Sequence, residues 1–221
     1  MSHCNSRAIS ATPALIRETE RRCRTGDGID IRITVICVHG LWRGTALTHR
    51  IPMESPVLKI HADGLLPPGM SLCVTDTRGS HSELTGEFAA IRQEMEQIAA
   101  FLGKKVLGQV TESAFWAALP ALRKACGDRA VLRAIHYFEE NARTLAQRDA
   151  LQAGQFAVFA ALVLESGRAS FALCQNVYCS TDVRHQGLSV ALALSQSILQ
   201  GSTGAWRMQG GGFAGTIQAY V

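Results

Sequence analysis

The chain has 221 residues, of which 47% are hydrophobic and 18% are charged, a balance typical of a globular protein rather than a disordered one. Its formal net charge of +4 comes from residues 1–52, where eight arginines outnumber four acidic residues, whereas basic and acidic residues balance from Met53 onward. Residues 1–52 contain no lysine and no continuous basic run, so we expect no nucleic-acid partner.

Residues 1–52 show no sustained periodicity apart from one short apolar run, and we separate them from 53–221 as a distinct segment. The stretch "SLCVTDTRGSH" alternates between apolar and polar residues and turns at Gly79, which predicts a strand. Ser80, His81 and Ser82 follow, and a turn with a helix cap explains them more simply than a cleft does.

An amphipathic helix is predicted next, because apolar residues recur at spacings of three and four and Gly103 stands where a C-cap belongs. Its stripe consists of Leu84, Phe88, Ile91, Met95, Ile98 and Leu102. A short helix near 112–119 is expected to end at Pro120, and Asp128 is expected to be the N-cap of a long helix.

Within that long helix, His136 is expected to be a packed helical residue, and Glu139 with Arg143 a surface ion pair four residues apart. A further helix is predicted between Gly154 and Gly167.

The C-terminal part predicts one more helix and a hairpin. Apolar residues around Leu188, Leu192 and Leu199 indicate a more fully buried helix, and strands at 205–208 and 214–221 are joined through three glycines. Helices between an early strand and a late hairpin predict an α+β fold with the antiparallel sheet on one side and the helices on the other, of the ferredoxin-like (split βαβ) kind.

The seven cysteines form no C-x-x-C pair, so we expect neither a metal site nor a disulfide framework. No run of about 18 apolar residues is present, so we expect no membrane partner. Acidic residues at Glu18 and Glu20 argue against a transit peptide, and a cytoplasmic location with free thiols is the expectation.

Three stretches in order resemble the C-terminal half of bacterial galactokinases, members of the GHMP kinase superfamily. They are "SLCVTDTRGSHSELTGEFAAIRQEM", "CGDRAVLRAIHYFEENAR" and "GSTGAWRMQGGGFAGTIQAYV". The resemblance runs from Met53 to Val221 and implies an incomplete C-terminal GHMP-kinase-type domain, a fragment truncated at both ends. It also implies ATP-dependent phosphorylation of D-galactose at the 1-hydroxyl, with ATP and Mg²⁺ as cofactors.

The family pattern also implies a sugar-binding signature, a Gly-Leu-Ser-Ser-Ser-Ala phosphate loop and a catalytic Asp, and none of them occurs between Met1 and Ser71. We therefore expect no catalytic residue in this chain and no activity from it alone. The alternatives are a non-catalytic sugar-sensing or complementing module, or another GHMP-type small-molecule kinase. Self-association through an exposed half-domain surface is a further expectation.

The resemblance places one group of residues beside the substrates and phosphates: Gly210, Gly211, Gly212, Phe213, Ala214 and Gly215. Consecutive glycines let backbone N–H groups approach an anion closely, but a hairpin or bulge selects glycine as well. Phe88 matches a position that is usually a Tyr in contact with the sugar, and it fits the apolar helix stripe equally well.

Overall fold

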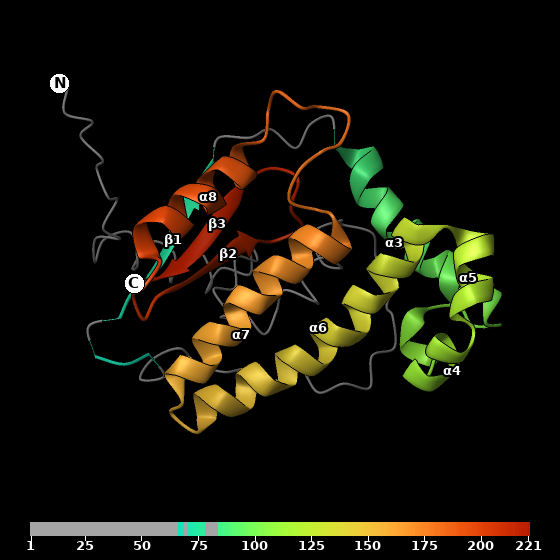
Figure 1. The fold of residues 1–221 in the computed structure, drawn as a ribbon, viewed down its shortest axis with the longest axis horizontal. Coiled ribbons are helices and arrows are strands. Elements are labelled where there is room, and N and C mark those ends of the chain that lie inside the picture. Colours follow the sequence, from blue (N-terminus) through green and yellow to red (C-terminus); the bar gives the residue numbers. More distant parts are fainter. Residues whose placement is uncertain (1–65, 69, 78–83) are drawn as a thin grey trace, which may run out of the picture.

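The computed structural model describes residues 66–68, 70–77 and 84–221, and a three-stranded antiparallel sheet packs there against several helices (Figure 1). The strands are β1 (Leu72–Asp76), β2 (Ala205–Gln209) and β3 (Thr216–Tyr220), in the order β1-β3-β2. The helices are α3 (Thr85–Phe101), the 3-10 turn η1 (Leu107–Gln109), α4 (Glu112–Ala117), α5 (Leu119–Cys126), α6 (Asp128–Gln152), α7 (Phe156–Ala169), the π-helical turn η2 (Ser170–Cys174) and α8 (Gly187–Leu199).

The α+β fold class, all three predicted strands and the helix ending before Gly103 are confirmed, and Gly103 has a φ of +71°. Central strand β3 pairs with β1 on one side and β2 on the other, so that Tyr220 lies opposite both Leu72 and Ala205. The predictions for residues 1–52 and for Ser80, His81 and Ser82 lie outside the described residues.

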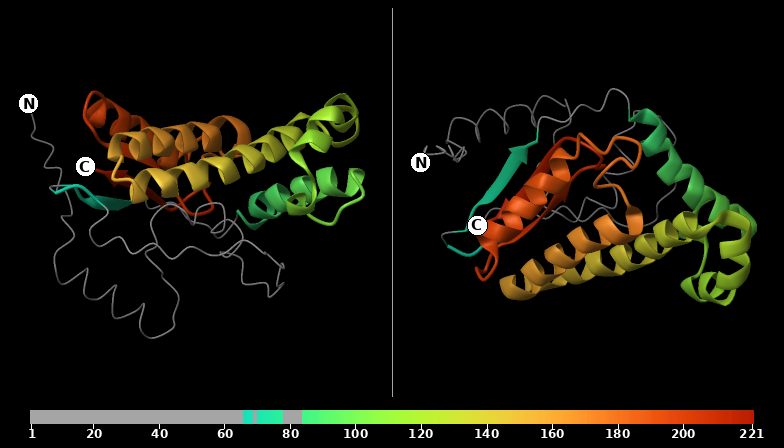
Figure 2. Two further views of the ribbon diagram at one scale, coloured as in Figure 1. Left: turned by 90° about the horizontal axis from the view of Figure 1, so that it is seen from below. Right: turned by 45° about the horizontal axis from the view of Figure 1, so that its top comes forward.

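Helices cover both faces of the sheet, which corrects the expected arrangement of helices on one side only. Ala205 and Tyr220 pack against α6 and α7, whereas Met208 and Ile217 pack against Leu188 of α8. Because successive strand residues point to opposite faces, these two pairs lie on different sides of the sheet. Figure 2 shows α8 running alongside the strands, with α6 and α7 as an antiparallel pair.

Helix α8 is less buried than its apolar sequence predicts. Leu188 is buried, but Val190, Leu194 and Ile198 are 59%, 56% and 75% exposed and recur at a spacing of four residues. The helix packs on the sheet with one face only, and no described residue covers the outer face. Its sequence contains no charged residue, so apolarity alone did not reveal which face points outward.

Two predicted helix boundaries are wrong for identifiable reasons. The chain breaks at Ala118, and Pro120 stands in the first turn of α5, where the missing N–H of a proline needs no helical partner. Asp128 is the first residue of α6 rather than its N-cap. Gly127 precedes it with a φ of +85°, and both carboxylate oxygens of Asp128 accept hydrogen bonds from Arg123.

Gly167 does not end its helix either, since α7 continues through it to Ala169. A Cβ at Gly167 would lie 3.2 Å from the Cβ of Arg207 and 3.4 Å from the main-chain oxygen of Trp206. The glycine therefore allows α7 and β2 to approach closely, a role that a sequence pattern cannot distinguish from that of a helix terminator.

The segment Phe156–Cys174 is long and apolar enough to cross a membrane by length and composition. Core helices pass the same test, and the α7 part of this segment packs against α6 and β2. It is therefore weak evidence for a membrane span, and the expectation of no membrane partner stays a prediction.

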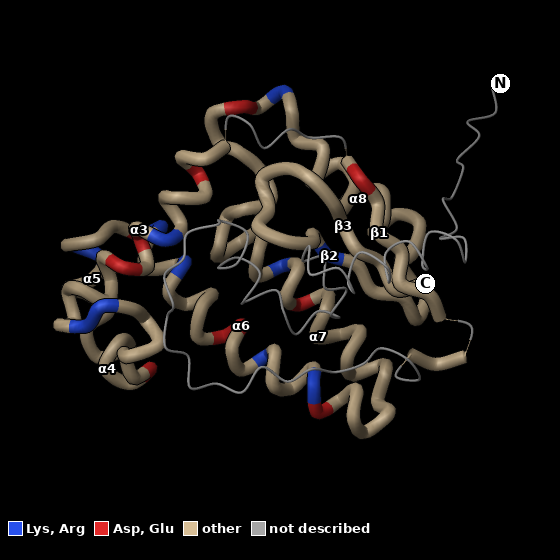
Figure 3. Tube along the Cα trace, turned by 180° about the vertical axis from the view of Figure 1, so that it is seen from behind, with Lys and Arg blue, Asp and Glu red and all other residues tan. Residues whose placement is uncertain are grey.

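A buried ionic cluster joins α6, α7 and β2. Glu140 of α6 accepts hydrogen bonds from Ser166 of α7 and from Arg143, and the Nη1 atom of Arg207 lies 3.3 Å from it. The predicted pair of Glu139 with Arg143 is present at 3.3 Å, but Arg143 is only 11% exposed and belongs to this cluster. Figure 3 shows positive and negative residues interspersed along α6.

The pKa of Glu140 reflects two opposing effects. Burial raises the pKa, but the positive charge of Arg207 and the hydrogen bond from Ser166 lower it. The lowering effects outweigh burial, so the pKa of Glu140 lies below its ordinary value. Glu140 is therefore a carboxylate held in its charged form inside the protein.

His136 is packed as expected, with 4% of its surface exposed and its Nδ1 atom without a hydrogen-bond partner among the described residues. Burial lowers its pKa to about 4, against the attraction of Glu140, and the charges of Arg207 and Arg143 lower it further. The neutral imidazole is thus the form that fits the fold.

We predict that this histidine makes stability fall with acid. Because the unfolded chain protonates His136 near pH 6.5 and the folded chain only near pH 4, stability is complete above pH 6.5 and declines as the pH falls through this window. The free energy of unfolding should be about 2 kcal/mol lower at pH 5 than at pH 7. Urea titrations at both pH values measure it, and an unchanged pH dependence in His136→Leu would contradict this assignment.

Candidate functional site

The glycine-rich hairpin turn, residues 210–215, connects β2 to β3, as the sequence predicted (Figure 1). Gly210, Gly212 and Gly215 have φ values of +78°, +90° and +97°, and Phe213 has a φ of +58° despite its side chain. These conformations explain the glycines as hairpin residues. They leave a second role beside a ligand open.

The hydrogen bonds of this turn divide its N–H groups into two sets. Phe213 donates to the main-chain oxygen of Asn176 at 2.5 Å, and Ala214 donates to Gly212 at 2.7 Å. The N–H groups of the three preceding residues, 210–212, have no hydrogen-bond partner among the described residues. The turn therefore offers backbone donors for an anion and no acidic or basic side chain.

Phe88 and the glycine-rich turn lie together, although 122 residues of sequence separate Phe88 from Gly210. The ring of Phe88, on α3, meets the ring of Phe213 edge to face with centroids 5.2 Å apart. A Cβ at Gly211 would lie 2.6 Å from Cε1 of Phe88, so glycine is required for this contact. Phe88 also packs against the core around Ile91, which confirms its place in the apolar helix stripe, whereas its role beside a sugar stays a prediction.

Asn176 is a residue of this region that sequence analysis missed. It follows η2, is fully buried, and its Nδ2 atom donates to the main-chain oxygen of Gly211 at 3.0 Å. No periodicity or motif marks it, because its contacts are with residues far along the chain.

Titratable groups near the start of α3 form a second small set. Cys179 Sγ lies 3.0 Å from the hydroxyl of Thr181 and 3.7 Å from Oε1 of Glu87. Among the described residues no group of three or more His, Cys, Asp and Glu side chains could hold a metal ion. The described part of the chain thus supplies anion donors and no magnesium cluster.

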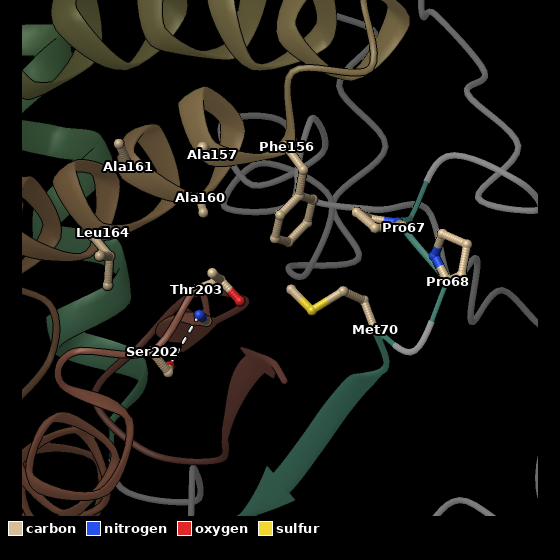
Figure 4. A pocket seen from close by; sticks show the side chains of 11 residues that line it. Pro67, Pro68, Met70, Phe156, Ala157, Ala160, Ala161, Leu164, Ser202 and Thr203 are labelled. Atoms are coloured by element: carbon tan, nitrogen blue, oxygen red, sulfur yellow. Dashed lines mark hydrogen bonds between the residues drawn. The ribbon is translucent and has the colours of Figure 1, made fainter.

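An apolar pocket of about 700 Å³ lies at the start of β2, at the end of that strand away from the glycine-rich turn. Figure 4 shows Phe156 of α7 and Met70 facing this space, with Ser202 and Thr203 at one side. None of the described residues that line this pocket is titratable, so they offer no acid or base for catalysis.

Known proteins resemble this chain in sequence and in fold. The galactokinases of Actinobacillus pleuropneumoniae serotype 3 (strain JL03) and serotype 5b (strain L20) are each 31% identical to it over 181 residues, covering 79% of this chain and 45% of theirs. The crystal structure of Lactococcus lactis galactokinase complexed with galactose matches with a TM-score of 0.53 and 23% identity, over 69% of this chain and 37% of that one. No family model matches the chain.

The chain spans about half the length of the curated relatives that it matches. The aligned part includes most of the described residues, and the fold agrees with the sequence similarity. In sequence and in fold the chain is therefore galactokinase-like over part of the length of those relatives.

Proposed function

We propose that residues 53–221 form a galactokinase C-terminal-type domain, separate from 1–52, which serves the ATP-dependent phosphorylation of D-galactose at its 1-hydroxyl. The observation that carries this proposal is the sequence similarity over 181 residues, which covers 79% of this chain. The expected location is the cytoplasm.

In this proposal the glycine-rich turn lies beside the phosphates. The unbonded N–H groups at 210–212 suit the negative charge that accumulates during phosphoryl transfer. Phe88 lies beside the sugar, where its ring offers an apolar contact and no hydroxyl. When bound, ATP supplies the phosphoryl group, and we assign no magnesium ligand to the described residues.

The chain by itself is expected to be inactive, because phosphoryl transfer needs a residue that positions the hydroxyl and a loop that holds the nucleotide. The sequence shows neither the catalytic Asp nor the Gly/Ser loop of the family pattern. A coupled ADP-release assay with galactose, ATP and magnesium should show no turnover above buffer.

Complementation makes this test sharper. Co-expression with the N-terminal part of a galactokinase that carries the missing motifs should produce galactose-dependent ADP release, and a complex with Gly212→Ala in this chain should not. Turnover by the chain alone would overturn the expectation of inactivity. A complex that forms without any turnover would favour the non-catalytic module, and turnover with another acceptor would favour a different kinase of the superfamily.

The exposed face of α8 supports the expectation of self-association. Three aliphatic side chains at 190, 194 and 198 lie on one uncharged helix face, and exposed apolar patches promote association. We predict that Leu194→Gln with Ile198→Gln lowers the apparent mass at high concentration in sedimentation velocity. The control is Gln196→Ala, a substitution at an exposed α8 position outside the apolar row. A monomeric parent chain at every concentration would contradict the prediction.

A further inference from the structure

We propose that Asn176 is a positioning residue that fixes the conformation of the glycine-rich turn. Asn176 accepts one hydrogen bond from the turn and donates another to it, and we call this pair of bonds the Asn176 clamp. The main-chain oxygen of Asn176 accepts from the N–H of Phe213 at 2.5 Å, and its side-chain Nδ2 donates to the oxygen of Gly211 at 3.0 Å. Its relevance to phosphoryl transfer rests on the proposed function, whereas the clamp itself does not.

Asn176 lies so close to the turn that only glycine can occupy position 212, between the two residues that form the hydrogen bonds. A Cβ on Gly212 would lie 1.9 Å from the oxygen of Asn176 and 2.9 Å from its Nδ2. Real Cβ atoms do not approach other heavy atoms so closely, so the backbones of the two segments are in direct contact at this point.

Backbone irregularities gather at the clamp from both sides. Gln175 has a φ of +54° and Phe213 a φ of +58°, and they are the only described residues other than glycine with a positive φ. Gln175 also follows the π-helical turn η2 directly. Strained backbone of this kind persists where the surroundings hold it, and it clusters at functional sites.

The burial of Asn176 is poorly explained by stability alone. The residue is fully buried, yet its Oδ1 atom has no hydrogen-bond partner among the described residues. An unpartnered buried oxygen is destabilising, so an apolar residue of similar size would serve packing better. What Asn176 provides instead is the donor to Gly211, which an apolar residue lacks.

The support behind the clamp reaches two helices. Arg133 of α6 is fully buried, donates from Nε to the oxygen of Cys174 at 3.0 Å, and pairs with Glu94 of α3 at 2.8 Å. Since Cys174 is the last residue of η2, the segment that carries Asn176 is fixed to the same helix α3 that carries Phe88.

The clamp also determines which N–H groups of the turn already have a protein partner. It occupies the N–H of Phe213 and the oxygen of Gly211, so the N–H groups at 210–212 remain the donors without a partner among the described residues. Loosening the clamp should therefore disorder the donors without removing any of them.

Hydrogen exchange of the full chain, followed by NMR, tests the clamp. The N–H groups of Phe213 and Ala214 are the reporters, because both are hydrogen-bonded in the turn, and Phe159 in α7 reports on the core. In Asn176→Ala and Asn176→Leu we expect exchange at Phe213 and Ala214 to be about tenfold faster, the effect of one lost hydrogen bond. Exchange at Phe159 should change less than twofold in Asn176→Leu.

Two further comparisons separate the possible outcomes. Gln175→Asn introduces a residue that tolerates positive φ well and leaves both hydrogen bonds of the clamp intact. The N–H groups of Phe213 and Ala214 should therefore exchange in this variant as they do in the parent chain. Equal acceleration at Phe159 and Phe213 in both Asn176 variants, or no acceleration at either reporter, would overturn the proposal. MgATP titration of the complex with a galactokinase N-terminal part then tests the link to function, with about tenfold weaker binding expected when this chain carries Asn176→Leu. If that complex, formed with the parent chain, binds no MgATP, the proposed function is contradicted and the exchange result on the clamp stays valid.

Discussion

Replacing Arg207 with methionine is expected to lower the free energy of unfolding by about 3 to 5 kcal/mol, because it leaves the buried carboxylate of Glu140 without its main counter-charge. Arg207 is 2% exposed and Glu140 is 3% exposed, so water cannot replace the lost partner. The Nη1 atom of Arg207 also lies 2.5 Å from the hydroxyl of Ser166, and that contact is lost as well. Chemical denaturation at pH 7 measures the change.

Two control variants test this explanation. Arg92→Met removes a shorter ion pair, 2.7 Å to Glu96 against 3.3 Å between Arg207 and Glu140, but its side chains are 45% and 35% exposed. It should cost less than about 1 kcal/mol. The double variant Arg207→Met with Glu140→Gln should be more stable than Arg207→Met alone, because it removes the buried negative charge. If the double variant is less stable than the single one, the loss comes from packing rather than from the unpaired charge.

Gly212→Ala is expected to destabilise the fold by about 3 to 5 kcal/mol, through a strained backbone and an overlap with a neighbouring chain segment. Its φ of +90° is unfavourable for alanine, and the new Cβ would lie 1.9 Å from the main-chain oxygen of Asn176. The oxygen belongs to backbone, so no side-chain rotation relieves the contact. The turn must separate from Asn176 or the hairpin must shift.

Gly201→Ala is a matched control for this substitution. Gly201 has a φ of +87°, and a Cβ there would meet no heavy atom within 4 Å. Its cost should therefore be the backbone strain alone, about 1 to 2 kcal/mol. Thermal unfolding followed by circular dichroism compares the two variants. Equal losses in both would show that the contact with Asn176 contributes nothing.

The sequence was most informative where structure depends on local periodicity. The stripe around Ile91 and Met95 predicted α3, and alternation predicted the hairpin of β2 and β3, because each pattern repeats within a single element. The glycine-rich turn was located for the same reason. Its position beside Phe88 is a finding of the structure, because no pattern in the residues brings the two together.

Features that depend on distant contacts were not predictable. The exposed row on α8 looks like a core sequence, because hydrophobicity does not tell which neighbours are present. Gly167 was interpreted as a helix end, although its role is to allow β2 to approach α7 closely. Asn176 belongs to no motif or periodic pattern in the sequence. For Gly167 and Asn176 the deciding partner is many residues away along the chain, and a single sequence does not record that proximity.

The order of strands has a consequence for how the chain acquires its structure. Within the described part, β1 pairs only with β3. The backbone of Leu72 therefore cannot pair until Tyr220, 148 positions later in the chain, has been synthesised. Helices α3 to α7 can form from nearby contacts while the ribosome is still synthesising the remainder. Strand β1 meanwhile presents an open edge, on which another nascent chain can pair. Closure of the sheet should thus be the late and slow step of folding, and the one at which a chaperone would have most effect.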